Sequence, residues 1–189
     1  DFYAKTGGGD PKPLEAVEKQ QLMSDVRQAL FASKICSYAQ GMNIIKAKSL
    51  EEEWDIPLGE LARIWKGGCI IRAGFLDQIK DAYQSNPELK NLLMDPNFAN
   101  ALVTRQSAWR RVVAMAVQSG VSVPGMSNSL AYFDSYRRHS LPANLVQAQR
   151  DFFGSHTYQR IDKPETEWFH TLWSDAQSAD SITTSGYTN

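Results

Sequence analysis

A helix-spaced apolar pattern that runs without a break over about 40 residues constrains this chain more than any other feature. Between Leu14 and about Glu53, apolar residues recur every three or four positions, which places them on one side of an α-helix. The stripe consists of Leu22, Val26, Leu30, Phe31, Ile35, Tyr38 and Met42. Gly41 lies within it, at a cost of ~1 kcal/mol against alanine, which a long helix tolerates. The pattern predicts one long first helix.

The sequence up to residue 138 continues with helical spacing, divided by glycine and proline. A short helix is expected to begin at Asp55 or Pro57 and to end at the Gly67-Gly68 pair. Further helices are expected over 69–83, 87–93, 97–118 and 124–138. Because no alternating strand pattern of useful length occurs, the fold class is predicted to be all-α. The expected architecture is a multi-helix bundle with a long first helix and an extended C-terminal tail.

Three parts are expected along the chain. Residues 1–13 contain three consecutive glycines and two prolines and are predicted to be a flexible lead-in. Residues 14–154 are predicted to form the all-helical domain, and residues 155–189 the extended tail. The tail is mostly polar toward its end, yet it carries Trp168 and Trp173. Two large aromatic residues in such a segment indicate that it docks on another surface.

The tryptophans of the helical part have a different expected place. Trp54, Trp65 and Trp109 fit core positions of the predicted helices. The apolar residues near the end of the 97–118 helix predict that this helix is central.

Composition excludes several classes of function. The net charge of −1 gives no reason to expect nucleic acid or an anionic membrane as a partner. No apolar run approaches the roughly 20 residues of a membrane-spanning helix. The two cysteines, Cys36 and Cys69, are too few for a disulfide framework and are expected to be buried thiols.

Motifs for cofactors and metals are missing as well. The three histidines are not spaced as metal ligands, and no glycine-rich strand–turn–helix segment for a dinucleotide occurs. We therefore expect no catalytic, cofactor-binding or metal-binding residues in this chain.

One stretch combines a helix with two candidate binding residues. Pro142 suits the first turn of a helix, and Gly154 suits the left-handed residue that follows many helix ends. Arg150 and His156 lie six residues apart near that end. A guanidinium and an imidazole so placed suit a phosphorylated or carboxylated small molecule. From spacing alone, a solvated helix arginine and a turn histidine remain the alternatives.

The polarity of this stretch follows the helical period. Its apolar residues Leu141, Leu145, Ala148 and Phe152 fall on one side, and Asn144, Gln147 and Asp151 on the other.

The same stretch resembles a known family. Residues 141–162, LPANLVQAQRDFFGSHTYQRID, are similar to the C-terminal part of the decarboxylating 6-phosphogluconate dehydrogenases. Three further segments agree with this family in its order: KICSYAQGM at 34–42, GGCIIRAGFL at 67–76 and FHTLW at 169–173. The resemblance runs from about Phe31 to Trp173. The family usually has a short, glycine-containing turn where this chain has Lys163 to Trp168.

This resemblance implies a function for the whole enzyme. Members oxidise 6-phosphogluconate with NADP and release CO₂ to give ribulose 5-phosphate, a reaction of the pentose phosphate pathway that requires no metal. Members are homodimers whose tail inserts through the partner subunit. The residues that match Arg150 and His156 contact the substrate near its phosphate, in the partner's active site.

The resemblance also implies a limited role for this chain. The family's catalytic lysine and glutamate, and its nucleotide-binding domain, precede the matching region. We therefore expect this chain alone to be inactive and the natural protein to start before Asp1. A cytoplasmic location is expected, with an organellar form left open.

Two alternatives remain open at this point. The first is a stand-alone helical dimerisation or binding module. The second is a related β-hydroxyacid dehydrogenase domain, against which Arg150 and His156 in a tail context argue.

Overall fold

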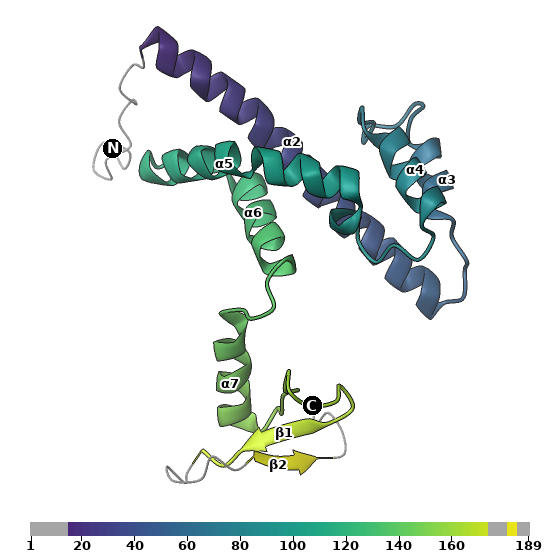
Figure 1. Ribbon diagram of the computed structural model, residues 1–189, viewed down its shortest axis with the longest axis vertical. Helices are drawn as coiled ribbons and strands as arrows, with labels where there is room; N and C mark the ends of the chain where they lie inside the picture. The colour runs from purple at the N-terminus through teal and green to yellow at the C-terminus, as the bar shows by residue number, and fades with distance from the viewer. Residues whose placement is uncertain (1–14, 174–180, 185–189) are drawn as a thin grey trace, which may run out of the picture. The chain divides into compact units, whose positions relative to one another are not determined.

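The computed structural model describes residues 15–173 and the backbone of a strand at 181–184 (Figure 1). Expectations for residues 1–14 and for most of the segment from 174 onward lie outside the described residues. The chain divides between Tyr136 and Arg137 into two compact units, and each is described by itself.

The fold is all-α, as predicted. In the described residues the helices are α2 (Ala16–Glu51), α3 (Leu58–Ile64), α4 (Leu76–Ser85), the 3₁₀ helix η1 (Leu92–Met94), α5 (Pro96–Gln118), α6 (Pro124–Tyr136) and α7 (Ala143–Gly154). The short strands β1 (Trp168–Thr171) and β2 (Ser181–Thr184) are an addition to the prediction. No described helix has both the length and the apolar character required to span a membrane.

The long first helix is confirmed as α2, and it contacts α5, α6 and η1 in the first unit. One side of α2 packs against α5 and α6, and α5 crosses α2 in Figure 1. Its buried apolar residues are Ala29, Ala32, Ile35, Cys36, Ala39 and Met42. Three of the six are alanines, so the neighbouring helices can approach α2 closely. Burial raises the pKa of the Cys36 thiol to about 12, which makes it an inert core residue.

Helix α5 is the second main element of this core. It begins where Asp95 accepts hydrogen bonds from the amides of Asn97 (2.9 Å) and Phe98 (3.1 Å), with Pro96 in the first turn. Trp109 is fully buried on α5, and its Nε1 donates to the Met126 carbonyl at 3.1 Å. That bond joins α5 to α6.

Two adjacent arginines of α5 hold two different helices. Arg110 forms a bidentate pair with Asp134 of α6, at 2.8 and 2.5 Å. Arg111 pairs with the buried Asp25 of α2, at 2.7 and 2.8 Å. Because consecutive helical residues point roughly 100° apart, neighbours in sequence can face different partners. The hydrogen bond from Arg111 is the main cause of the lowered pKa of Asp25.

The predicted helix over 69–83 is wrong in its first half, since α4 begins only at Leu76. Gly68 has a left-handed backbone, with φ of +67°, and the chain then continues in turns. This irregular segment is held by tertiary contacts. The Tyr38 hydroxyl donates to the Ile71 carbonyl, and the Tyr38 and Phe75 rings meet edge to face at 5.2 Å. Tertiary packing here overrides the helical spacing.

The predicted helix over 87–93 is also wrong. Only the 3₁₀ helix η1 is present in this region. The side chain of Asn91 accepts a hydrogen bond from the Leu93 amide at 2.8 Å, which offers the backbone an alternative to an α-helical turn. Pro96 disfavours helical backbone at the residue before it.

The core prediction for Trp54 is wrong, because its side chain is 58 % exposed, whereas Trp109 is 0 % exposed. The expectation that the end of α5 is central is only partly met. Val112 and Ala116 are buried there, but Met115 and Val117 are exposed. Helical geometry turns these neighbours to the surface once Ala116 faces inward.

The second unit combines α7 with the two strands. β1 and β2 pair antiparallel, from Trp168 opposite Thr184 to Thr171 opposite Ser181. A further bridge joins Tyr158 to Phe169. Helix α7 thus packs with the segment predicted as tail, while the predicted limit between helical domain and tail followed Gly154. Four-residue strands are too short to leave a periodic pattern in the sequence.

The contrast between two tryptophans gives a stability prediction. Trp109→Ala should lower the free energy of unfolding by roughly 3–5 kcal/mol, because it leaves a large cavity in the core. Trp54→Ala should change it by about 0.5 kcal/mol or less. Urea unfolding of both variants would test this. Equal losses would contradict the assignment of the core.

Candidate functional site

Helix α7 buries the opposite side from the one that its apolar residues suggest. Asp151 is its buried residue, at 0 % exposure. The large apolar side chains of α7 are exposed, namely Leu145, Val146, Phe152 and Phe153. The polar side of α7 therefore faces the rest of the second unit.

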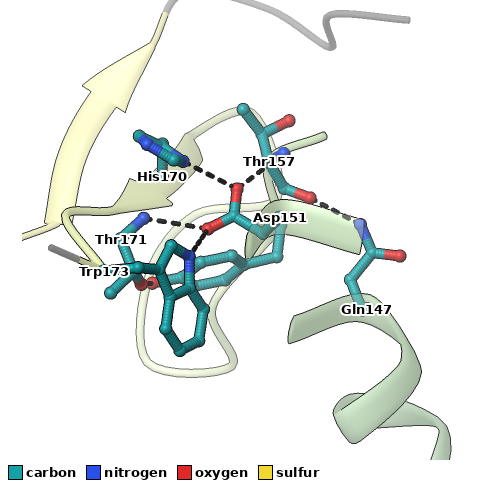
Figure 2. Close-up of polar contacts among 7 residues, drawn as sticks. Gln147, Asp151, Thr157, His170, Thr171 and Trp173 are labelled. Carbon is teal, nitrogen blue, oxygen red and sulfur yellow. Dashed lines mark hydrogen bonds and ion pairs between the residues drawn. The ribbon is translucent and has the colours of Figure 1, made fainter. Parts of the chain in front are cut away.

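Asp151 binds three segments of that unit (Figure 2). Its Oδ1 accepts from the Thr157 amide at 3.0 Å and contacts His170 Nδ1 at 2.9 Å. Its Oδ2 accepts from the Thr171 amide at 3.0 Å and from Trp173 Nε1 at 2.9 Å. One carboxylate thus joins the end of α7 to the turn after it, to β1 and to the residues that follow.

These four contacts use the acceptor capacity of the carboxylate, which is about four sites. Burial alone would raise the pKa of Asp151. The hydrogen bonds from Thr171, His170 and Trp173 outweigh burial, so its pKa is lowered from the ordinary value. Asp151 therefore stays ionised and fully bound.

Gly154 does not have the role that the sequence predicted. It is the last residue of α7, and the left-handed residue is Ser155, with φ of 53° and ψ of 40°. A Cβ on Gly154 would lie 2.9 Å from Nε2 of His156. A side chain at this position would therefore require the imidazole of His156 to shift.

Thr157 lies in a strained conformation beside this imidazole. Its φ is 51°, which is unfavourable for a β-branched residue. Its amide donates to Asp151, and its carbonyl accepts from Gln147 Nε2 at 2.5 Å. Both backbone groups of the strained residue are thus held by α7.

The two residues predicted to bind substrate differ in their exposure and in their contacts with this cluster. Arg150 is exposed, and its Nη1 donates to Oε1 of Gln147 at 3.2 Å. His156 is half-buried, and its Nδ1 has no hydrogen-bond partner within the described residues. Gln147 therefore connects Arg150 with the carbonyl of Thr157, the residue after His156.

A groove of about 450 Å³ borders this cluster. Gln147, Thr171 and Trp173 line it, together with residues from 158 to 162. Arg150 and His156 do not line this groove, so it is not the site that they predict. In the described part of the chain, no three His, Cys, Asp or Glu residues are grouped so that they could hold a metal ion.

Sequence reasoning missed the central members of the cluster. Asp151 and Gln147 were placed on a polar helix side, and nothing indicated that this side is buried. His170 was noted only as a poor metal ligand. The docking of Trp173 on another surface stays a prediction, and within the unit its ring packs edge to face on Phe152 at 5.8 Å.

Comparison with known proteins gives the relatives of this chain. Residues 3–173 match the family described as 6-phosphogluconate dehydrogenase, C-terminal domain. A decarboxylating 6-phosphogluconate dehydrogenase of Spinacia oleracea is 68% identical over 170 residues, which are 89% of this chain and 35% of the relative. A chloroplastic enzyme of Arabidopsis thaliana is 67% identical over 157 residues, 83% of this chain and 32% of that enzyme. The chain thus spans about a third of the length of these relatives.

A solved structure of a protein from the same family is similar to this chain. Plasmodium falciparum 6-phosphogluconate dehydrogenase, described in its apo form and in complex with its cofactor NADP⁺ and its substrate 6-phosphogluconate, matches with a TM-score of 0.78. It is 42% identical, and the match covers 91% of this chain and 37% of that one.

The Asp151 network gives a prediction for stability and its pH dependence. Removing one partner of a buried charged network costs roughly 3–5 kcal/mol, so Asp151→Asn should unfold the second unit at lower urea concentration. Because the pKa of Asp151 is lowered in the folded protein, its contribution is complete above the ordinary value of 3.8. The contribution is lost as the pH falls through the lowered value.

Urea unfolding at neutral and acidic pH, followed by the indole N–H signal of Trp173, would measure this effect. Asp162→Asn is the matched control, because Asp162 forms an exposed pair with Arg160 and such pairs contribute little. The prediction is wrong if Asp151→Asn unfolds like this control.

Proposed function

Since the chain belongs to the 6-phosphogluconate dehydrogenase family and matches its C-terminal domain, we propose that it supplies part of the substrate site of a decarboxylating enzyme. The complete protein would oxidise 6-phosphogluconate with NADP⁺ and release CO₂ and ribulose 5-phosphate. The observation that carries the proposal is the family match, which spans both Arg150 and His156.

Arg150 is proposed to bind the substrate phosphate. Its guanidinium is exposed at the end of α7 and can present two parallel N–H groups to phosphate oxygens. His156 is proposed to contact the same end of the substrate. The support is its place in the turn that follows α7, six residues after Arg150, and its ring nitrogen without a hydrogen-bond partner in the described chain.

NADP⁺ is proposed as the cofactor of the complete protein. None of the described residues is assigned to it, because no described strand leads through a glycine-rich loop into a helix. No catalytic residue is assigned to this chain either.

A homodimer with an exchanged tail is proposed as the assembly. The support is the exposed apolar side of α7, where Leu145 is 77% and Phe153 75% exposed. Four large apolar side chains on one short helix are typical of an interaction surface. A second copy of the protein would cover them. Cytoplasmic location stays a prediction. A relative whose name gives no organelle and a chloroplastic relative have nearly the same sequence identity to this chain.

The role of Arg150 can be tested by substitution in the full-length protein. A hydrogen bond to a charged group contributes ~1.5–3 kcal/mol, so Arg150→Ala should weaken 6-phosphogluconate binding by roughly 10- to 150-fold. Arg150→Lys should recover only part of this, because an ammonium lacks the planar fork. Affinity for NADP⁺ should barely change.

Calorimetric titration with each ligand would measure these constants. Arg27→Ala is the control, since Arg27 is an exposed arginine of α2, in the other unit. An Arg150→Ala protein that binds 6-phosphogluconate normally, or that loses NADP⁺ instead, would disprove the role.

The proposed interface gives a separate prediction. Leu145→Glu and Phe153→Glu each place a charge on the exposed apolar side of α7, and each should shift the full-length protein from dimer toward monomer in analytical ultracentrifugation. Asn144→Glu adds the same charge to the polar side of the same helix, at an exposed position, and should leave the dimer intact. If all three variants stay dimeric, α7 is not part of the interface.

A further inference from the structure

We propose that Gln147 and Asp151 are positioning residues that hold Arg150 and His156 in place for the substrate, an inference that rests on the proposed function. The two residues lie one helical turn apart, so their side chains project from the same side of α7. Neither needs to touch the substrate. Their effect passes through the turn that follows the helix.

The strained residue of this turn shows what the pair does. Left-handed backbone is costly for a residue with a Cβ, and more so for a branched one such as Thr157. Such strain persists only where the surroundings hold it, and it is common at functional sites. Asp151 holds the amide of Thr157, and Gln147 holds its carbonyl. Without these bonds Thr157 would relax to ordinary backbone.

Relaxation of Thr157 would move His156. The His156 ring lies over Gly154, where a side chain would otherwise be, and the backbone between these two residues is the left-handed Ser155. The turn from 154 to 157 therefore fixes where the imidazole lies. A change of backbone at Thr157 would shift the peptide group that joins it to His156.

Gln147 acts on both proposed substrate contacts. Its amide nitrogen donates to Thr157, and its amide oxygen accepts from Arg150. One side chain thus sets the spacing between a guanidinium and the turn that carries an imidazole. An amide suits this role because it offers both a donor and an acceptor.

Asp151 is a positioning residue rather than a reactive one. It is fully buried, and its oxygens already take part in four contacts, so it has no free capacity for a ligand. It also ties the turn to β1 through Thr171. The geometry around Thr157 therefore depends on the docked strand as well as on the helix.

The test compares two glutamines of α7 in the full-length protein. Gln147→Met keeps the volume but removes both hydrogen bonds, and it should weaken 6-phosphogluconate binding about tenfold, the change that ~1.4 kcal/mol produces. Gln149→Met makes the same change at an exposed position and should bind normally. NADP⁺ affinity should stay the same in both.

A Thr157→Gly background separates positioning from a general loss of stability. Glycine adopts left-handed backbone without steric cost. The hydrogen bonds that Gln147 and Asp151 make to the backbone of residue 157 are therefore less important when this residue is glycine. In this background, Gln147→Met should therefore weaken substrate binding by about threefold or less. A purely structural effect of Gln147 would give the same loss in both backgrounds. Asp151→Asn is expected to destabilise the whole second unit. The test therefore uses substitutions of Gln147.

Parallel measurement of Arg150→Ala distinguishes the two levels of inference. If Arg150→Ala weakens binding but Gln147→Met does not, or if Thr157→Gly leaves the tenfold loss unchanged, the positioning role is wrong and the substrate site stands. If Arg150→Ala binds normally, the substrate site is wrong and the positioning role falls with it. The expected pattern, with loss at 147, none at 149 and a reduced loss in the Thr157→Gly background, supports both.

Discussion

A carboxylate taken out of water must recover its lost hydration, and the structure of the second unit depends on how Asp151 does so. Four hydrogen-bond contacts from the turn, from β1 and from Trp173 replace the solvent. Two of these donors are backbone amides, which only a particular path of the chain can bring to the carboxylate. The charge therefore selects that path. An apolar residue at this position would pack against the tail but would not specify the turn.

The first unit uses charge differently. Its core is apolar, and the Arg110–Asp134 and Arg111–Asp25 pairs lie at the margin, where the arginines keep part of their exposure to water. These pairs fix which helices meet α5, while burial of Trp109, Phe98 and the α2 stripe provides the main stabilisation. Among the described residues of the second unit, Phe169 is the buried apolar residue, so the polar cluster has a larger share in holding that unit together.

This difference explains how much could be predicted from the sequence. Helices α2, α5 and α6 could be predicted because their apolar residues recur with a 3.6-residue spacing. These same residues form the core contacts that stabilise the helices. The false helices at 69–75 and 87–93 failed because tertiary contacts and the Asn91 side chain compete with local propensity, and a periodic pattern records neither. Arg150 and His156 were predicted as substrate contacts mainly through family resemblance, and they stay a prediction. Gln147 and Asp151 were missed because a buried polar helix side looks like a solvated one until its partners are known.

The polarity of α7 connects these observations. A helix with one apolar and one polar side normally buries the apolar side, yet in this chain the polar side binds the tail and the apolar side stays exposed. Burying the polar side requires a matched set of donors, which the tail supplies. Leaving the apolar side exposed is costly unless another surface covers it. In the proposed dimer, α7 would lie between two layers, one of its own chain and one of the second copy. Arg150 bonds to Gln147 of the buried side, so in that dimer its own chain would position a side chain that is proposed to bind substrate.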